Sequence, residues 1–147
     1  MTEAQPQFND ELASGIAAFE SKNFGLAMQI LSPLADGGNA EAMYRVAIIH
    51  QNGLGRMQNK RLALRMMQGA AEQGHAFAMH GLGFMHYQGE CTEQDYTEAL
   101  KWFEKAAEQG LPGAMMTLGM MAESGQGMDP NPELAQQWYQ KATEASE

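Results

Sequence analysis

Apolar side chains recur along this chain at steps of three and four residues, which is the spacing of one face of an α-helix. No stretch alternates with a period of two, and β-branched residues are scarce, so strands are not expected. The spacing therefore predicts an all-α protein. The expected helices span residues 9–21, 24–36, 40–52, 60–74, 76–88, 96–110, 112–124 and 132–145.

The apolar pattern repeats every 36 residues, which is the signature of a repeat protein. Two columns of alanine keep this step: Ala27, Ala63, Ala99 and Ala135, and then Ala42, Ala78 and Ala114. Three stretches, 40–75, 76–111 and 112–147, align without a gap. Each is interpreted as two helices, A and B, joined by a loop that carries glycine.

Polar residues mark the expected ends of the B helices. Asn23, Asn59, Asp95 and Asn131 stand just before them, and Asn or Asp oxygens accept the unpaired N–H groups of a first helical turn. Three glycines suit the left-handed residue that ends such a helix. They are Gly38, Gly74 and Gly110.

Three runs carry a family resemblance: AMHGLG at 78–83, ALKWF at 99–103 and KAAEQG at 105–110. They resemble the Sel1-like repeat, a relative of the tetratricopeptide repeat, and the resemblance covers three repeats at 40–75, 76–111 and 112–147. Residues 8–39 look like one tetratricopeptide-type unit with a shorter loop, preceded by an N-terminal tail at 1–7. The resemblance implies a single domain over 1–147, a right-handed α-solenoid of about four helix-turn-helix repeats with a concave side lined by the A helices.

Polar residues replace apolar ones on the B helix of the last repeat. Leu100 and Ala107 stand where the last unit has Gln136 and Thr143, seven residues apart on one face. A terminal repeat needs a polar outer face for solubility, so we expect four units to complete the solenoid.

The resemblance also implies a partner-binding groove on the A helices. The residues expected there are Leu12, Ile16, Phe19, Tyr44, Ile48, Phe77, His80, Phe84, Tyr87, Met116 and Met120. Phe77, Phe84 and Tyr87 are expected to be the most exposed, with His80 beside them. The alternative is that about half of this strip is ordinary core. Aromatic residues and methionine are enriched in the cores of protein interfaces.

Charge is acidic overall and uneven. The net charge is −9, from 18 acidic and 9 basic residues, which argues against general affinity for nucleic acid or anionic lipid. Residues 40–75 are the exception at +3. Their secondary basic patch, Arg56, Lys60, Arg61 and Arg65, is either a solvated face or a contact for an acidic partner.

Several classes are unlikely from composition. One cysteine cannot form an internal disulfide, no apolar run approaches about 20 residues, and the N-terminus has no signal-peptide pattern. We therefore expect a soluble, cytoplasmic protein without a membrane span.

Chemistry-bearing motifs are not evident. Nucleophile, phosphate-loop and zinc-protease motifs are missing, so we expect no enzyme, no cofactor and no metal. Cys91 replaces a loop glycine that the other repeats keep at Gly55 and Gly127. His50 and His86 share a column and are interpreted as packing residues.

The predicted function is a non-catalytic interaction scaffold that binds a peptide or helix of another protein in the groove. One alternative is a dedicated acidic inhibitor or immunity-type protein, whose binding would weaken strongly with salt. Another is a metal-handling protein, because thioethers select Cu(I) and the chain has 13 methionines. Most of these methionines, however, fall in core columns, and methionine fills irregular cores readily.

Overall fold

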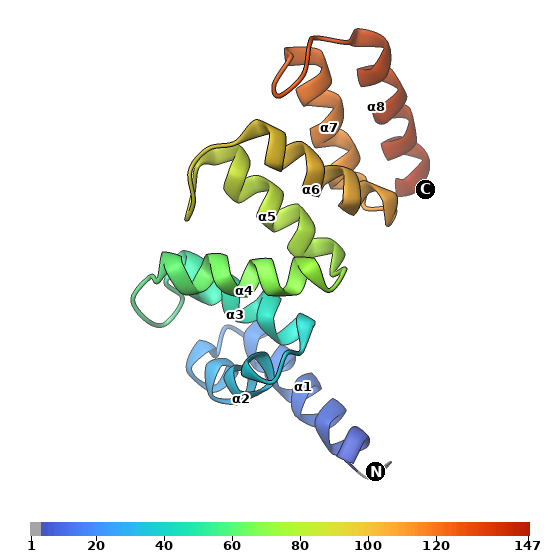
Figure 1. Ribbon diagram of the computed structural model, residues 1–147. Coiled ribbons are helices and arrows are strands. Elements are labelled where there is room, and N and C mark those ends of the chain that lie inside the picture. The colour runs from blue at the N-terminus through green and yellow to red at the C-terminus, as the bar shows by residue number, and fades with distance from the viewer. Residues whose placement is uncertain (1–3) are drawn as a thin grey trace. The chain divides into compact units, whose positions relative to one another are not determined.

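The computed structural model describes residues 4–147, with side chains from residue 10 onward. The described chain consists of eight α-helices and their connecting turns (Figure 1), and it divides into two compact units, Met1–His75 (unit 1) and Ala76–Glu147 (unit 2). Unit 1 contains α1 (Ala4–Glu20), α2 (Phe24–Asp36), α3 (Ala40–Asn52) and α4 (Lys60–Glu72). Unit 2 contains α5 (Ala76–Gln88), α6 (Tyr96–Glu108), α7 (Pro112–Ser124) and α8 (Pro132–Ser146).

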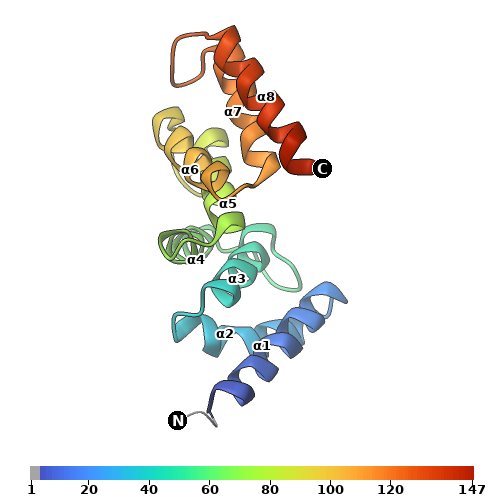
Figure 2. The ribbon, with the colours of Figure 1, turned by 90° about the vertical axis from the view of Figure 1, so that its right-hand side faces the viewer.

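The helices pack in sequential pairs, α1 with α2, α3 with α4, α5 with α6, and α7 with α8 (Figure 2). Inside unit 1, α2 also packs on α3, and inside unit 2, α6 packs on α7. The predicted all-α arrangement of helix pairs is confirmed.

The main difference from the predicted elements lies at the start. Helix α1 begins at Ala4 rather than at residue 9, so part of the stretch predicted as a tail at 1–7 is helical. Residues 1–3 of that predicted tail lie outside the described residues. Pro6 is compatible with this earlier start because it falls in the first turn, where backbone N–H groups have no partner inside the helix.

The predicted caps are confirmed. The side-chain oxygen of each cap accepts a backbone N–H three residues on, at 3.1 Å for Asn59, Asp95 and Asn131 and at 3.4 Å for Asn23. The B helices α4 and α6 end two residues earlier than predicted, at Glu72 and Glu108. The expected glycines follow those ends with positive φ angles of 94°, 90° and 86° at Gly38, Gly74 and Gly110.

The repeated alanines lie at the centre of the helix pairs. All seven alanines of the two columns are fully buried. Because alanine has only a Cβ, helices can approach closely there. The larger side chains of the core fill the space around them, and the most completely buried are Leu31, Ile49, Met67, Leu82, Met85, Phe103 and Met121.

Glycine allows the closest approach in unit 2. A Cβ added to Gly83 would lie 2.6 Å from Cε1 of Phe103, so the ring of α6 rests directly on the backbone of α5. Gly119 meets the Tyr139 ring in the same way, one repeat later. In this position the Phe103 ring also contacts the aromatic rings of Phe84 and Tyr87 on α5, with centroids 5.1 and 6.4 Å away.

Candidate protein-binding surfaces

In unit 1 the predicted groove residues are largely engaged in packing. All five are half-buried: Leu12, Ile16 and Phe19 on α1, and Tyr44 and Ile48 on α3. This agrees with the alternative that part of the strip is core.

Ring contacts account for the burial of two of them. The Phe19 ring meets Phe24 edge-on with centroids 5.7 Å apart, and the Arg45 guanidinium lies 4.9 Å from the Phe19 centroid. Tyr44 stacks on His75 at 4.8 Å. These side chains therefore give unit 1 only a small free apolar surface along its A helices.

Glu41 organises the polar side of α3. Its carboxylate accepts hydrogen bonds from Nε of Arg45 at 2.8 Å and from Nε2 of His75 at 2.9 Å. Burial alone would raise the pKa of Glu41, but the hydrogen bonds from His75 and Arg45 outweigh it and hold that pKa below its usual value. The carboxylate thus ties the end of α4 to α3 within unit 1.

In unit 2 the strip is more open. Phe77 on α5 is 55% exposed, and Met116 and Met120 on α7 are 45% and 51% exposed. Exposed apolar side chains that gather in a patch mark interaction sites, so these three on two A helices of one unit form a candidate contact surface.

The remaining aromatic side chains of α5 point partly inward. Phe84 packs edge-on against Phe103 at 5.1 Å, and the Tyr87 hydroxyl donates to Oε1 of Gln126 at 2.9 Å. Of the three side chains expected to be most exposed, only Phe77 is exposed; Phe84 and Tyr87 are half-buried. The cause is Gly83, which lets the Phe103 ring come close enough to cover its neighbours on α5.

His80 joins the two helices of this surface. A Cβ added to Gly113 would lie 3.5 Å from Cε1 of the His80 ring, so the imidazole rests on the backbone of α7. Burial lowers the pKa of His80, and the backbone of Gly113 opposes this only in part. His80 is therefore a neutral packing residue near neutral pH.

The contact between His80 and Gly113 places two rows of side chains beside each other. One row on α5 is Phe77, His80 and Phe84, and the other on α7 is Gly113, Met116 and Met120; both follow the i, i+3, i+7 spacing of one helical face. We call the exposed side chains of Phe77, Met116 and Met120, together with the half-buried His80 between them, the α5–α7 surface.

The predicted basic patch is exposed in unit 1. Arg56 lies in the loop after α3, and Lys60, Arg61 and Arg65 lie on α4. Within the part of the chain that the structure describes, none of the four forms an ion pair, whereas Arg45 pairs with Glu41.

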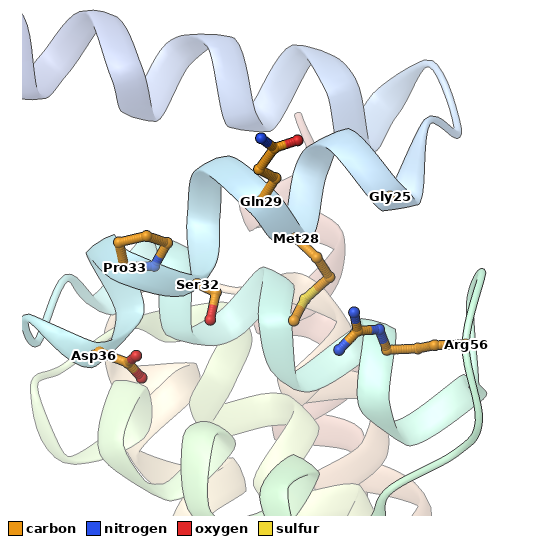
Figure 3. A pocket seen from close by; sticks show the side chains of 7 residues that line it. All are labelled: Gly25, Met28, Gln29, Ser32, Pro33, Asp36 and Arg56. Atoms are coloured by element: carbon orange, nitrogen blue, oxygen red, sulfur yellow. The ribbon is translucent and has the colours of Figure 1, made fainter.

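Arg56 is one of the residues that line a pocket of about 450 Å³ in unit 1 (Figure 3). We call this pocket the polar notch. The pocket lies between α2 and the loop after α3, and the Arg56 side chain reaches across it toward Met28 and Ser32. Its lining residues are Gly25, Met28, Gln29, Ser32, Pro33, Asp36 and Arg56.

A second pocket, of about 320 Å³, lies in unit 2 and is apolar; we call it the apolar notch. It is lined by Leu100, Glu104, Leu118, Met128, Leu134 and Trp138, from α6, α7, α8 and the loop between the last two. The two pockets share three positions of the repeat. Positions 28, 32 and 56 of the polar notch return as 100, 104 and 128, which is two periods of 36 later.

The other residues considered for chemistry, the possible metal ligands and the methionines, do not gather at one site in the described part of the chain. Among the described residues, no three His, Cys, Asp or Glu side chains lie close enough to hold a metal ion. Six methionines are buried, namely Met28, Met67, Met79, Met85, Met115 and Met121, as core columns predict. His50 is 6% exposed, in agreement with its interpretation as a packing residue.

Cys91 has the backbone of the glycine that it replaces. Its φ angle is 66°, against 71° for Gly55 and 74° for Gly127 at the equivalent loop positions. The interpretation of Cys91 as a substituted loop glycine is therefore confirmed.

The described chain consists of eight helices in pairs, and the 36-residue period is strict from residue 40 onward. These features define the class: a helical-repeat protein of the tetratricopeptide-like kind. The chain belongs to the Sel1 repeat family, whose model, Sel1 repeat, matches it three times, at residues 40–75, 76–111 and 112–146. An N-terminal helical pair, α1 and α2, precedes these repeats. Proteins of this kind typically mediate protein interactions and are generally non-catalytic.

Solved structures agree with this assignment. A Sel1 repeat protein from Oxalobacter formigenes matches with a TM-score of 0.84 and 33% identity, over 90% of this chain and 55% of that one. The c5321 protein, a protective antigen of uropathogenic Escherichia coli with an SLR fold, matches with a TM-score of 0.79 and 31% identity, over 82% of this chain and 26% of that one. This chain thus spans about half and about a quarter of those two chains.

A more distant similarity concerns the fold alone. Helicobacter pylori cysteine rich protein B matches with a TM-score of 0.66 and 17% identity, over 85% of this chain and 90% of that one. No curated protein sequence matches this chain significantly. None of the described helices combines the length and apolar character that crossing a membrane requires.

The sequence patterns do not predict the two notches. Their positions are nevertheless visible in the repeat alignment, because columns 28/100 and 56/128 pair a B helix with the loop of the next repeat in each half of the chain. An alignment does not show whether the side chains at these positions fill the space between the helices or line an open pocket.

Proposed function

We propose that this Sel1 repeat protein is a non-catalytic scaffold whose α5–α7 surface binds a peptide or helical segment of another protein. The observation that supports this is the exposure of Phe77, Met116 and Met120 around the contact of His80 with Gly113. Apolar anchors in the centre of an interface contribute most of its binding free energy. Flexible methionines adapt to the shape of a partner.

The charge of unit 2 narrows the class of partner. Unit 2 contains eleven acidic residues and three lysines, so a basic or neutral segment would approach it most readily. The same excess of charge favours a second candidate function, a dedicated acidic inhibitor of a basic partner. Binding that weakens only a few-fold between 50 mM and 500 mM salt supports the apolar scaffold, and a loss of a hundredfold or more supports the inhibitor.

Capture from native lysate tests the proposal with three versions of the protein. Met120→Glu places a charge on the α5–α7 surface, and Gln136→Glu adds the same charge to an exposed position on α8. We expect wild type and Gln136→Glu to retain the same proteins and Met120→Glu to lose them, with equal melting temperatures. Identical capture by all three folded versions would refute the role of this surface.

A further inference from the structure

The apolar notch of unit 2 has the features of a binding pocket in its own right. It is a space of about 320 Å³ between two repeats, with buried Leu118 in its wall and the half-buried side chains of Leu100, Leu134 and Trp138 around it. A pocket lined by leucine and tryptophan suits one large apolar side chain of a partner, because burying such a side chain is the main source of binding free energy at interfaces.

The apolar notch is a different place from the α5–α7 surface. Leu118 is two residues from both Met116 and Met120, and two residues turn an α-helix by about 200°. The notch therefore opens on the other side of α7. An occupant of the notch would leave Met116 and Met120 uncovered.

The charges around the notch indicate the kind of segment that would carry the side chain. Unit 2 has eleven carboxylates, one of which, Glu104, lines the notch. The three lysines of unit 2 each contact other side chains of the same unit. Lys101 pairs with Glu98 at 3.7 Å and lies 5.4 Å from the centroid of Trp102, Lys105 lies 4.7 Å from the same centroid, and Lys141 lies 4.9 Å from that of Trp138. A cation–π contact leaves the charge of a lysine in place, so unit 2 has a net charge of −8, from eleven acidic residues and three lysines, and this excess would attract a basic segment.

The polar notch of unit 1 differs from the apolar notch in the side chains at the shared positions. At the equivalent place in unit 1, Arg56 stands where the apolar notch has Met128, and Ser32 stands where it has Glu104. The polar notch thus contains Arg56, Ser32 and the carboxylate of Asp36, whereas the one charged side chain that lines the apolar notch is Glu104.

We propose that the apolar notch binds a single apolar side chain carried on a basic segment of a partner protein. This site is independent of the function proposed for the α5–α7 surface.

The test is an NMR titration of the full chain with a blocked peptide, Lys-Lys-Leu-Lys-Lys. The indole N–H of Trp138 reports on the notch, and that of buried Trp102 is the internal reference. We expect saturable shifts at Trp138 and not at Trp102. Replacing the leucine of the peptide by serine is expected to weaken binding about tenfold or more, and replacing its lysines by glutamates to abolish it.

A substitution copied from the other unit tests the notch itself. Met128→Arg introduces the residue that the equivalent loop already carries at position 56, so the fold is expected to hold. It should weaken peptide binding at least tenfold. The control is Met57→Arg, the same change at a loop methionine of unit 1 that is 88% exposed, and it should leave binding unchanged.

Three results would overturn the proposal. They are equal binding of the serine peptide, unchanged binding to folded Met128→Arg, and Trp138 shifts that depend on protein concentration without peptide, which would mean that a second copy fills the notch. Met120→Glu separates the two proposals, because it should abolish partner capture and leave the peptide titration as in wild type.

Discussion

The imidazole of His80 rests on the backbone of Gly113, where a Cβ would lie 3.5 Å from the ring carbon Cε1. Through this contact the side chain of His80 on α5 reaches the backbone of α7 directly. The exposed Phe77 therefore lies one turn before the contact and Met116 one turn after it. The candidate binding surface of unit 2 depends on this pair.

Stability should fall as the pH is lowered from 7.5 toward 5. Burial lowers the pKa of both His50 and His80 below the ordinary value of 6.5, and the charge of Arg56 lowers that of His50 further. The unfolded chain then binds more protons than the folded one, so the stabilising effect is complete above about 6.5 and is lost below it. Chemical denaturation across this range measures the slope.

The variant His80→Gln provides the control, because it should flatten part of that slope. The lowered pKa of Glu41 acts in a separate window, below its ordinary value of 4.5, and does not contribute between pH 5 and 7.5. A stability that is constant over this range in wild type would contradict the account of the buried histidines.

Gly83→Ala should destabilise the protein by about 1–3 kcal/mol. The new Cβ would lie 2.6 Å from the fully buried Phe103 ring, so the ring would have to shift within the core. The matched control is Gly25→Ala on α2, where a Cβ would meet nothing within 4 Å and alanine is the better helix former. Urea denaturation should give opposite signs for the two variants.

Cys91→Gly should stabilise the loop before α6 by up to about 1 kcal/mol. Cys91 has a left-handed backbone, which is unfavourable for a residue with a Cβ, and glycine occupies the equivalent places at Gly55 and Gly127. Cys91→Ala removes the thiol while keeping the Cβ. If it were as stable as Cys91→Gly, backbone strain would not be the cause.

The sequence was sufficient for the elements and their spacing. The 36-residue period shows where the three helix pairs from residue 40 onward lie, whereas the start of α1 at Ala4 was not predicted. Caps such as Asn59 and Asn131 depend only on local hydrogen bonds, so local reasoning finds them. Full burial of Ala63 and Ala99 follows from the same period.

The exposure of the groove residues was only partly predictable. Phe77 and Phe84 stand on one face of α5, yet Phe77 is exposed and Phe84 is half-buried, and the Phe84 ring packs against the Phe103 ring of α6 with centroids 5.1 Å apart. That contact joins two helices, and helical spacing alone does not contain it. The apolar notch, which Leu100 and Met128 line, also depends on contacts between helices and therefore does not follow from helical spacing alone.

The central claim is that a partner protein binds at the α5–α7 surface. Once capture from lysate has identified that partner, its affinity can be measured. Isothermal titration calorimetry would compare wild type, Met120→Glu and Gln136→Glu against that purified partner, with melting temperatures recorded for each. The account predicts an affinity at least tenfold lower for Met120→Glu, because a carboxylate would replace an apolar contact of the α5–α7 surface, and an unchanged affinity for Gln136→Glu. A folded Met120→Glu protein that binds as tightly as wild type would contradict the claim that this surface is where the partner binds.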